Sequence, residues 1–227
     1  MATPWIKICG LTRPEDTRLA LDLGALYLGC ILVPTSPRAV SLDQARALAK
    51  IAGPRLVTVV RNLPPEELAE IVSVLHPGVL QLHGEETPER VAGLREAHPE
   101  VELWRVLALA HDSENPGEDC VELLAEAREY LAAGAHAIMI DTWTPKGSGG
   151  TGETCDWAIA SNVVELLEGP VVLAGGITPE IVRHAVRLVR PAGLDISSGV
   201  EEAPGIKSPE RMRKLFHALK HWDEQRN

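Results

Sequence analysis

The stretch PVVLAGGITPEIVRHAVRLVRPAGLDISSG (170–199) decides the fold class, because it contains two short strand-like runs separated by an amphipathic one. The runs at 170–176 and 193–199 are short and bounded by proline or glycine, which predicts buried strands. Between them, residues 178–189 mix apolar and charged side chains at helical spacing. Two strands joined by a helix in this way are parallel neighbours in a sheet.

The same alternation runs through the rest of the chain. Strands are predicted at 5–9, 26–33, 55–60, 79–83, 101–109, 137–141, 170–176 and 193–199. Helices are predicted at 14–24, 41–53, 64–75, 87–98, 121–134, 155–169, 178–189 and 208–222. Eight strand–helix units predict a closed (β/α)8 TIM barrel, and a doubly wound open sheet is the alternative. No linker divides the sequence, so we expect one domain over 1–227.

The composition argues against several classes of protein. The 227 residues carry 22 Lys and Arg against 32 Asp and Glu, a net charge of −10. This charge argues against a nucleic-acid partner, which requires clustered basic residues. No apolar run approaches the ~20 residues of a membrane span. Only eight residues are aromatic, so the core must consist mainly of Val, Leu, Ile and Ala.

The four cysteines, Cys9, Cys30, Cys120 and Cys155, are widely separated and form no C-x-x-C pair. We therefore expect no structural metal. The first residues, MATPWIKICG, lack a basic region followed by a long apolar run, so we expect no signal peptide. Together these features predict free thiols in the reducing cytoplasm.

In a (β/α)8 barrel the active site lies at the carboxyl ends of the strands. In the first strand, alternation places Lys7 and Cys9 on one face, toward the barrel interior, with Ile6 and Ile8 on the other. A nearby ammonium group favours a thiolate, which would make Cys9 a better base. The alternative is a small buried hydrophobic residue, and on spacing alone this is the favoured interpretation.

Asp141 ends the sixth strand after four apolar residues. Such a carboxyl group either caps a loop or protonates a substrate, and partial burial would raise its pKa toward that of a general acid. Its position alone does not separate the two interpretations. His83 ends the fourth strand, and we expect it to line the same end of the barrel.

Glycines follow the seventh and eighth strands, in AGG (174–176) and SSG (197–199). Loops after these strands often bind phosphate through backbone N–H groups, and 177–179 would open a helix beside them. A separate loop contains Gly147-x-Gly149-x-x-Gly152, the spacing of a dinucleotide site. That interpretation is rejected because five residues separate the strand from the first glycine. We expect instead a lid over the pocket, or a simple flexible loop.

Several motifs together resemble the phosphoribosylanthranilate isomerase family. They are KICGLT (7–12), SPR (36–38), QLHGEE (81–86), DT (141–142), GGTGETCDW (149–157), AGGITPE (174–180) and DISSGVEEAPGIK (195–207). KICG-x-T and D-x-SSGVE-x-x-PG-x-K are long and specific, and the matches span nearly the whole chain.

The resemblance implies a (β/α)8 barrel that acts in tryptophan biosynthesis without a metal or organic cofactor. The reaction is the Amadori rearrangement of N-(5-phosphoribosyl)anthranilate. The resemblance makes Cys9 the general base and Asp141 the general acid, and places Arg38 on the anthranilate carboxylate. We also assign Lys7, His83 and Asp195 to substrate binding. The phosphate is expected at Gly175, Gly176, Ser198 and Gly199.

Some residues depart from the family pattern. The family usually carries aromatic residues where this chain has GCIL (29–32), VTVV (57–60) and Cys155. The lost aromatics predict a repacked interior or a slightly different pocket.

Two other functions are compatible with the sequence: a related barrel isomerase acting on another aminoaldose phosphate, and a non-catalytic regulator that binds a sugar phosphate. Cys9 and Asp141 count against the regulator, because binding alone needs neither residue. We expect a small phosphosugar-anthranilate substrate, no nucleic-acid or membrane partner, and either a monomer or a homodimer.

Overall fold

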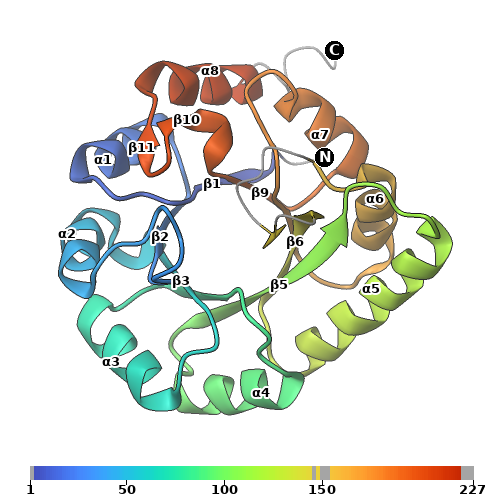
Figure 1. Cartoon of the computed structure of the whole chain (residues 1–227), viewed down its shortest axis with the longest axis horizontal. Helices are drawn as coiled ribbons and strands as arrows, with labels where there is room; N and C mark the ends of the chain where they lie inside the picture. The colour runs from blue at the N-terminus through green and yellow to red at the C-terminus, as the bar shows by residue number, and fades with distance from the viewer. Residues whose placement is uncertain (1–2, 145–146, 149–153, 221–227) are drawn as a thin grey trace.

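The computed structural model describes residues 3–144, 147–148 and 154–220. Within them a ring of parallel strands is surrounded by helices (Figure 1). The strands of the ring are β1 (Trp5–Ile8), β2 (Tyr27–Ile31), β3 (Leu56–Val60), β4 (Val79–Leu82), β5 (Glu102–Ala110), β6 (Ala137–Thr144), β8 (Val171–Leu173) and β9 (Gly193–Ile196). The helices are α1 (Pro14–Leu23), α2 (Leu42–Ala52), α3 (Pro65–Leu75), α4 (Pro88–Ala97), α5 (Pro116–Ala132), α6 (Trp157–Leu166), α7 (Val182–Val189) and α8 (Pro209–Lys220).

Strand pairing closes the ring. β1 pairs with β2 and β9, and the order continues through β3, β4 and β5 on one side and through β8 and β6 on the other. Parallel pairing of β5 with β6 joins the two ends, in a register that runs from Trp104 opposite Ala137 to Ala110 opposite Trp143. The predicted (β/α)8 barrel is confirmed, and the open sheet is excluded.

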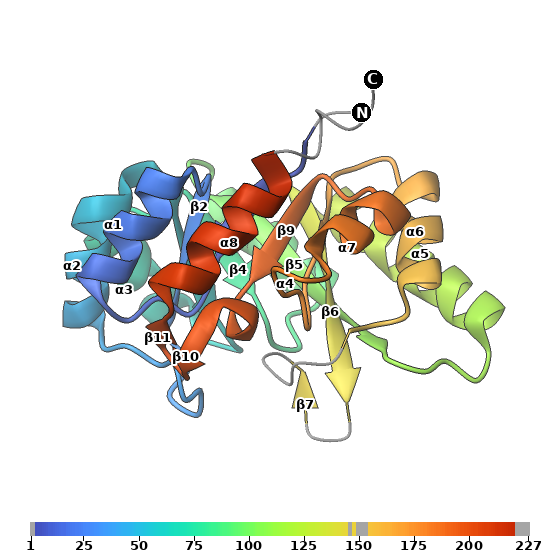
Figure 2. The ribbon, with the colours of Figure 1, turned by 90° about the horizontal axis from the view of Figure 1, so that it is seen from above.

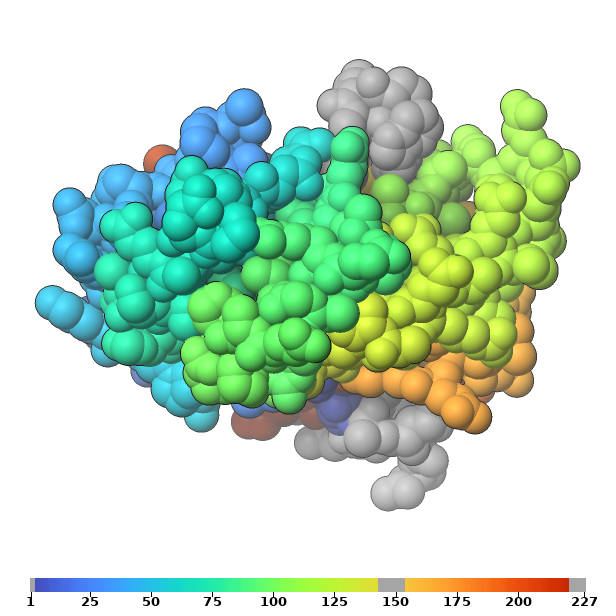
Figure 3. All heavy atoms as spheres, turned by 90° about the horizontal axis from the view of Figure 1, so that it is seen from below, coloured from blue at the N-terminus to red at the C-terminus, as the bar shows by residue number. Residues whose placement is uncertain are grey.

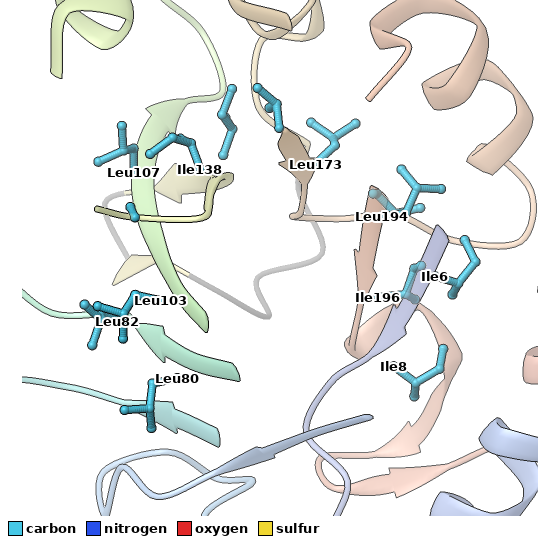
Figure 4. Packing of buried hydrophobic residues seen from close by; sticks show 14 of the residues in the cluster. Ile6, Ile8, Leu80, Leu82, Leu103, Leu107, Ile138, Leu173, Leu194 and Ile196 are labelled. Carbon is cyan, nitrogen blue, oxygen red and sulfur yellow. The ribbon is translucent and has the colours of Figure 1, made fainter. Parts of the chain in front are cut away.

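Apolar side chains on the outer face of the strands pack against the helices. Figure 4 shows Ile6, Ile8, Leu173 and Leu194 on the outer side of the strand ring, and all four are at least 95 % buried. The atoms of α3, α4 and α5 cover one side of this core (Figure 3). Alternation along each strand then leaves every second side chain facing the barrel interior.

The end of the barrel interior at which the strands begin is filled by apolar side chains. Trp5, Tyr27 and Trp104 form an aromatic cluster, with ring centroids 4.7–5.0 Å apart. Trp104 belongs to a buried layer with residues such as Val57 and Met139. These side chains close the interior at this end, whereas a cavity lies toward the carboxyl ends of the strands.

Local sequence signals explain several helix ends. Ser41 and Gln44 form the reciprocal hydrogen bonds of a capping box before α2, at 3.2 and 2.8 Å. Gly24 ends α1 in the left-handed region, at φ 103°. None of the described helices is long and apolar enough to cross a membrane.

Three details of the secondary structure differ from the predictions. α5 begins at Pro116, whereas the predicted helix began at residue 121, because proline is favourable in the first helical turn. α7 begins at Val182 instead of residue 178, after a turn in which the N–H groups of Ile181 and Val182 both bond to the Thr178 carbonyl. The short strands β7 (Gly147–Ser148), β10 (Glu201–Ala203) and β11 (Ile206–Lys207) were not predicted. Figure 2 shows all three on the side of the barrel at which the β6 arrow ends.

Candidate active site

A cavity of about 770 Å³ lies at the carboxyl ends of the barrel strands. Every residue that the sequence analysis assigned to the site, except Lys7, lines this cavity: Cys9, Arg38, His83, Asp141, Gly175, Gly176, Asp195, Ser198 and Gly199. These residues come from six different strands or the loops that follow them. The fold therefore brings residues that are far apart in the sequence to a single surface.

Lys7 is fully buried beneath the cavity, and its Nζ forms an ion pair with Asp195 Oδ2 at 2.9 Å. β1 and β9 are paired in the register that places these two residues opposite each other. Gly29 on the neighbouring strand leaves room for the cluster, because a Cβ there would lie 3.0 Å from Lys7 Cε and 3.1 Å from Cys9 Sγ. The predicted placement of Lys7 and Cys9 in the barrel interior is confirmed.

The electrostatic effect on Cys9 is opposite to the sequence-based expectation. Burial, followed by the negative charge of Asp195, raises the pKa of the Cys9 thiol above its ordinary value. The Lys7 ammonium lowers the pKa, as expected, but its effect is smaller. Burial also lowers the pKa of Lys7, but Asp195 and Cys9 outweigh it, and the net pKa of Lys7 is raised. Cys9 is therefore a thiol in the resting protein, beside a permanently charged ammonium group.

Asp141 has the properties of a proton donor. Its side chain is buried at the end of the apolar part of β6, and its Oδ1 accepts a hydrogen bond from the Thr142 backbone N–H at 2.8 Å. Burial, with a further contribution from Asp195, raises the pKa of Asp141 to about 7. At neutral pH this carboxyl group is therefore protonated in a large fraction of molecules, as a general acid requires.

His83 lies beside this acid, with its Nε2 3.6 Å from Asp141 Oδ2. Burial, helped by the charges of Lys7 and Arg61, lowers the pKa of His83 to about 4. The imidazole is therefore neutral at pH 7, and its contact with Asp141 is not an ion pair under these conditions. Gln81 contacts the other ring nitrogen, Nδ1, at 3.4 Å.

Arg38 lines the cavity on the side of β2 and forms part of an ion-pair cluster. Its Nε and Nη2 donate to the two carboxylate oxygens of Glu201, at distances of 2.8–3.1 Å. Lys207 Nζ donates to Glu201 Oε1 at 2.7 Å. Arg38 follows β2, whereas Glu201 and Lys207 belong to β10 and β11, more than 160 residues later in the sequence.

The loops expected to bind phosphate contain glycines at positions where the backbone requires them. Gly175 and Gly176 have φ values of 82° and 62°, in the left-handed region that favours glycine. A Cβ at Gly199 would lie only 1.9 Å from the Ile177 carbonyl oxygen, so the two loops touch. Ser198 and Gly199 belong to a single turn of 3-10 helix, Ser198–Val200. Because α7 begins only at Val182, the N-terminus of that helix is farther from these glycines than expected.

Sequence reasoning missed the roles of several residues. Glu201 and Lys207 stand inside the quoted motif DISSGVEEAPGIK, so the motif itself was the available signal. Gln81 shares the interior face of its strand with His83, and alternation alone would have placed it in the cavity. Arg61 also lines the cavity.

The predicted lid, 142–152, lies mostly outside the described residues, as does the loop motif Gly147-x-Gly149-x-x-Gly152 beyond Ser148. Within the described part of the chain, no group of three or more His, Cys, Asp or Glu side chains is placed to hold a metal ion.

Known proteins share both the sequence and the fold. Residues 6–218 match the family model "N-(5'phosphoribosyl)anthranilate (PRA) isomerase". The N-(5'-phosphoribosyl)anthranilate isomerase of Methanopyrus kandleri is 40 % identical over 223 residues, which cover 95 % of this chain and 98 % of the relative.

Solved structures agree with this match. The phosphoribosyl anthranilate isomerase of Thermus thermophilus is 36 % identical, with a TM-score of 0.77 over 95 % of this chain and 98 % of its own. A phosphoribosyl anthranilate isomerase in complex with reduced 1-(o-carboxyphenylamino)-1-deoxyribulose 5-phosphate is 28 % identical, with a TM-score of 0.76 over 96 % of this chain and 98 % of its own. With the cavity, the buried acid and the paired glycine loops, these matches show that the chain belongs to the N-(5'-phosphoribosyl)anthranilate isomerase family.

Proposed function

We propose that this protein converts N-(5'-phosphoribosyl)anthranilate into 1-(2-carboxyphenylamino)-1-deoxyribulose 5-phosphate in tryptophan biosynthesis, with Asp141 as general acid and Cys9 as general base. The observation that carries the assignment is a buried carboxyl group with a pKa of about 7 that shares one cavity with a thiol beside a lysine. Family membership supports the substrate, and the geometry supports the two roles.

The acid acts first. Asp141 donates its proton to the ring oxygen of the ribose while the bond between that oxygen and C1′ breaks. The lone pair of the anthranilate nitrogen moves toward C1′, which produces an open-chain iminium ion. Because Asp141 is protonated near neutral pH, it can supply this proton without a strongly acidic medium.

The base acts on the iminium ion. Cys9 removes the proton from C2′, and the electrons of that C–H bond neutralise the cation to give an aminoenol, which tautomerises to the ketone. One proton has moved onto the ring oxygen and one has left C2′, so the overall reaction is an isomerisation. The iminium charge makes the C2′ proton acidic enough for a thiolate to remove it.

Acid and base must reach opposite faces of the sugar. β1 and β6 are separated around the ring by β9 and β8, so Cys9 and Asp141 approach the cavity from different sides. Lys7 lies next to the thiol and lowers the free energy of its thiolate form, although burial keeps the thiol dominant at rest. The reactive pair is therefore a minor protonation state of the free protein.

Local groups must attract the substrate, because both its anionic groups are repelled by a net charge of −10. Arg38 can hold a planar carboxylate through two parallel N–H bonds, a geometry that lysine does not offer. The backbone N–H groups around Gly175, Gly176, Ser198 and Gly199 would receive the phosphate.

A fluorescence assay tests this proposal, because consumption of the substrate changes the emission of its anthranilate group. Purified protein should turn over N-(5'-phosphoribosyl)anthranilate, whereas the Cys9→Ala/Asp141→Ala double variant should not. Rescue of a tryptophan auxotroph that lacks this isomerase should follow the same pattern.

Three results would contradict the proposal. Wild-type turnover no higher than that of the double variant would exclude the activity. Turnover of a histidine-pathway ribonucleotide with none of the anthranilate substrate would assign the barrel to another aminoaldose phosphate. Tight binding of a sugar phosphate without turnover would indicate a regulator.

A further inference from the structure

We infer that Glu201 and Lys207 are positioning residues, which hold the Arg38 guanidinium from outside the cavity and give the pocket its preference for a carboxylate-bearing substrate. This inference rests on the proposed function, since it concerns the part of that site which would receive the anthranilate group. Neither residue lies among the cavity-lining residues of the described chain, whereas Arg38 does. Glu201 contacts Arg38 directly, and Lys207 reaches Arg38 through Glu201.

The geometry of the guanidinium leaves one of its edges for a ligand. Arg38 uses its Nε and Nη2 atoms for Glu201, which is one of its two bidentate edges. Within the described chain, Nη1 has no hydrogen-bond partner. A guanidinium offers five N–H donors in a planar fork, so the Nη1–Nη2 edge can still hold a second carboxylate. Because Arg38 lines the cavity and Glu201 does not, we assign the Nη1–Nη2 edge to a ligand in the cavity.

The net charge of the three side chains favours an anionic ligand. Arg38 is 9 % exposed, Glu201 is 7 % exposed and Lys207 is fully buried, so all three lie in a region of low dielectric constant. Burial raises the pKa of Glu201, but the hydrogen bonds from Arg38 and the charge of Lys207 outweigh it and keep the pKa below its ordinary value. One carboxylate is thus shared by two cations. The cluster keeps one net positive charge, which an anionic ligand can neutralise.

Residues of the surrounding loops hold this arrangement in place. Gly10 adopts φ 70°, and a Cβ there would lie 2.6 Å from Arg38 Cδ, so only glycine lets the arginine stem pass. The Gly205 backbone N–H donates to Glu201 Oε1 at 3.2 Å. The Lys207 backbone N–H donates to Asp16 Oδ2 at 3.1 Å, which ties the β10–β11 hairpin to α1.

Two ligands distinguish a role of Glu201 in positioning Arg38 from a role in general structural support. The first is reduced 1-(o-carboxyphenylamino)-1-deoxyribulose 5-phosphate, and the second is the same compound without its carboxylate. We would measure the dissociation constant of each by isothermal titration calorimetry, for wild type and for Glu201→Gln. The matched control is Asp43→Asn, which neutralises a carboxylate in an exposed ion pair with Arg46 on α2.

Glu201→Gln should weaken binding of the carboxylate ligand about tenfold or more, because a charge-assisted contact to Arg38 loses its alignment. Binding of the ligand without the carboxylate should change by less than about twofold, and Asp43→Asn should leave both constants unchanged. Equal weakening of both ligands would overturn the inference, because it would show a structural role only. Unchanged or tighter binding of the carboxylate ligand would also overturn it, and tighter binding would make Glu201 a competitor for Arg38.

Glu201→Gln also leaves Lys207 buried without its partner, which can unfold the protein. The Glu201→Gln/Lys207→Met double variant removes that buried charge and should show the same selective loss. The wild-type protein provides a measurement that needs no variant. The Arg38 Nε–H resonance should keep its hydrogen-bonded chemical shift when the carboxylate ligand binds, since Glu201 retains that edge. A large shift of this resonance would show that the ligand displaces Glu201, and would overturn the inference.

The experiment distinguishes failure of the proposed function from failure of the positioning role alone. Wild-type protein that neither turns over the anthranilate substrate nor prefers the carboxylate ligand would overturn both proposals. Wild-type protein that prefers the carboxylate ligand, with the same preference in Glu201→Gln, would overturn only the positioning role.

Discussion

The two ends of the barrel interior are built from the same strands but contain opposite kinds of side chain. On β1 the interior positions are Trp5, then Lys7, with Cys9 following the strand, so one strand passes from an aromatic ring to an ion pair to a thiol. At the closed end, Trp5 packs with Tyr27 and Trp104. At the open end, the ionisable side chains of Lys7, Asp141 and Asp195 are buried.

The apolar closed end stabilises the fold, whereas burial of ionisable groups at the open end costs stability. Burial of the aromatic cluster and the neighbouring apolar layer stabilises the fold in proportion to the apolar area removed from water. Burial of Asp141 disfavours its ionised form, which is why its pKa rises to about 7. We expect changes at the open end to alter activity and changes at the closed end to alter stability.

The largest expected effect is at the open end. Asp141→Asn removes the proton donor and should lower kcat by about 10²- to 10⁴-fold, the usual contribution of a general acid. Stability should not fall with it. The folded-state pKa of Asp141 is raised, so its contribution to stability is complete at low pH and is lost as the pH rises through about 7.

The measurements are kcat by fluorescence and the melting temperature at pH 8, with Asp43→Asn as control. A melting temperature equal to or above that of wild type, together with the loss of kcat, is the expected pair of results. A variant that melts lower and retains kcat would reverse the roles assigned to the two ends.

Trp104→Ala tests the closed end. Removal of this nearly fully buried ring should cost about 3–5 kcal/mol in the free energy of unfolding, measured by urea denaturation. Because Trp104 does not line the cavity, kcat per folded molecule at 25 °C should stay within about twofold of wild type. Leu166→Ala, at an exposed apolar position on α6, is the control and should be nearly neutral. A fall in kcat as large as that of Asp141→Asn would show that the two ends are coupled.

Lys7→Met probes the boundary between the two ends. It leaves Asp195 buried without its partner, which should cost about 3 kcal/mol in the free energy of unfolding. Lys7→Met/Asp195→Asn removes both charges and should recover most of that loss without restoring kcat. The exposed Lys50→Met variant on α2 is the control. If Lys7→Met were as stable as Lys50→Met, the ion pair would have no structural role.

The sequence predicted most of the fold because its signals are local and repeated. Each strand is a short apolar run, and the helices have their own start or stop residues, such as Ser41 or Gly24. The eight units can therefore be counted in the sequence alone. The predicted start of α5 is five residues too late, because proline, which is common in loops, also favours the first turn of a helix.

The site was harder to predict because its properties depend on distant residues. The effect of Lys7 on Cys9 followed from strand alternation, but the opposing effects of burial and Asp195 depend on how β1 and β9 pair. Likewise, the partner of Arg38 is 163 residues away in the sequence. The structure also shows where three of the few aromatic residues lie: they pack together at the closed end. Smaller and polar side chains line the cavity.

The pH dependence of kcat/KM tests the central claim most directly, because the acid and the base titrate in an unusual order. The active form has Asp141 protonated and Cys9 ionised. The pKa of Asp141 is about 7, and that of Cys9 is raised above its ordinary value. Below pH 7 only the thiolate fraction changes with pH, so kcat/KM should rise tenfold per unit. Between pH 7 and the pKa of Cys9 the two fractions change in opposite directions, and the profile should be flat.

We would therefore measure kcat/KM from pH 5.5 to 9.5 for wild type and for Asp141→Asn. The account predicts a break near pH 7 in the wild-type profile, and a lower Asp141→Asn profile that continues to rise above pH 7. The Asp141→Asn profile also controls for titration of the substrate phosphate, which both proteins share. A wild-type profile without a break near pH 7, or the same break in Asp141→Asn, would contradict the assignment of Asp141 as the acid.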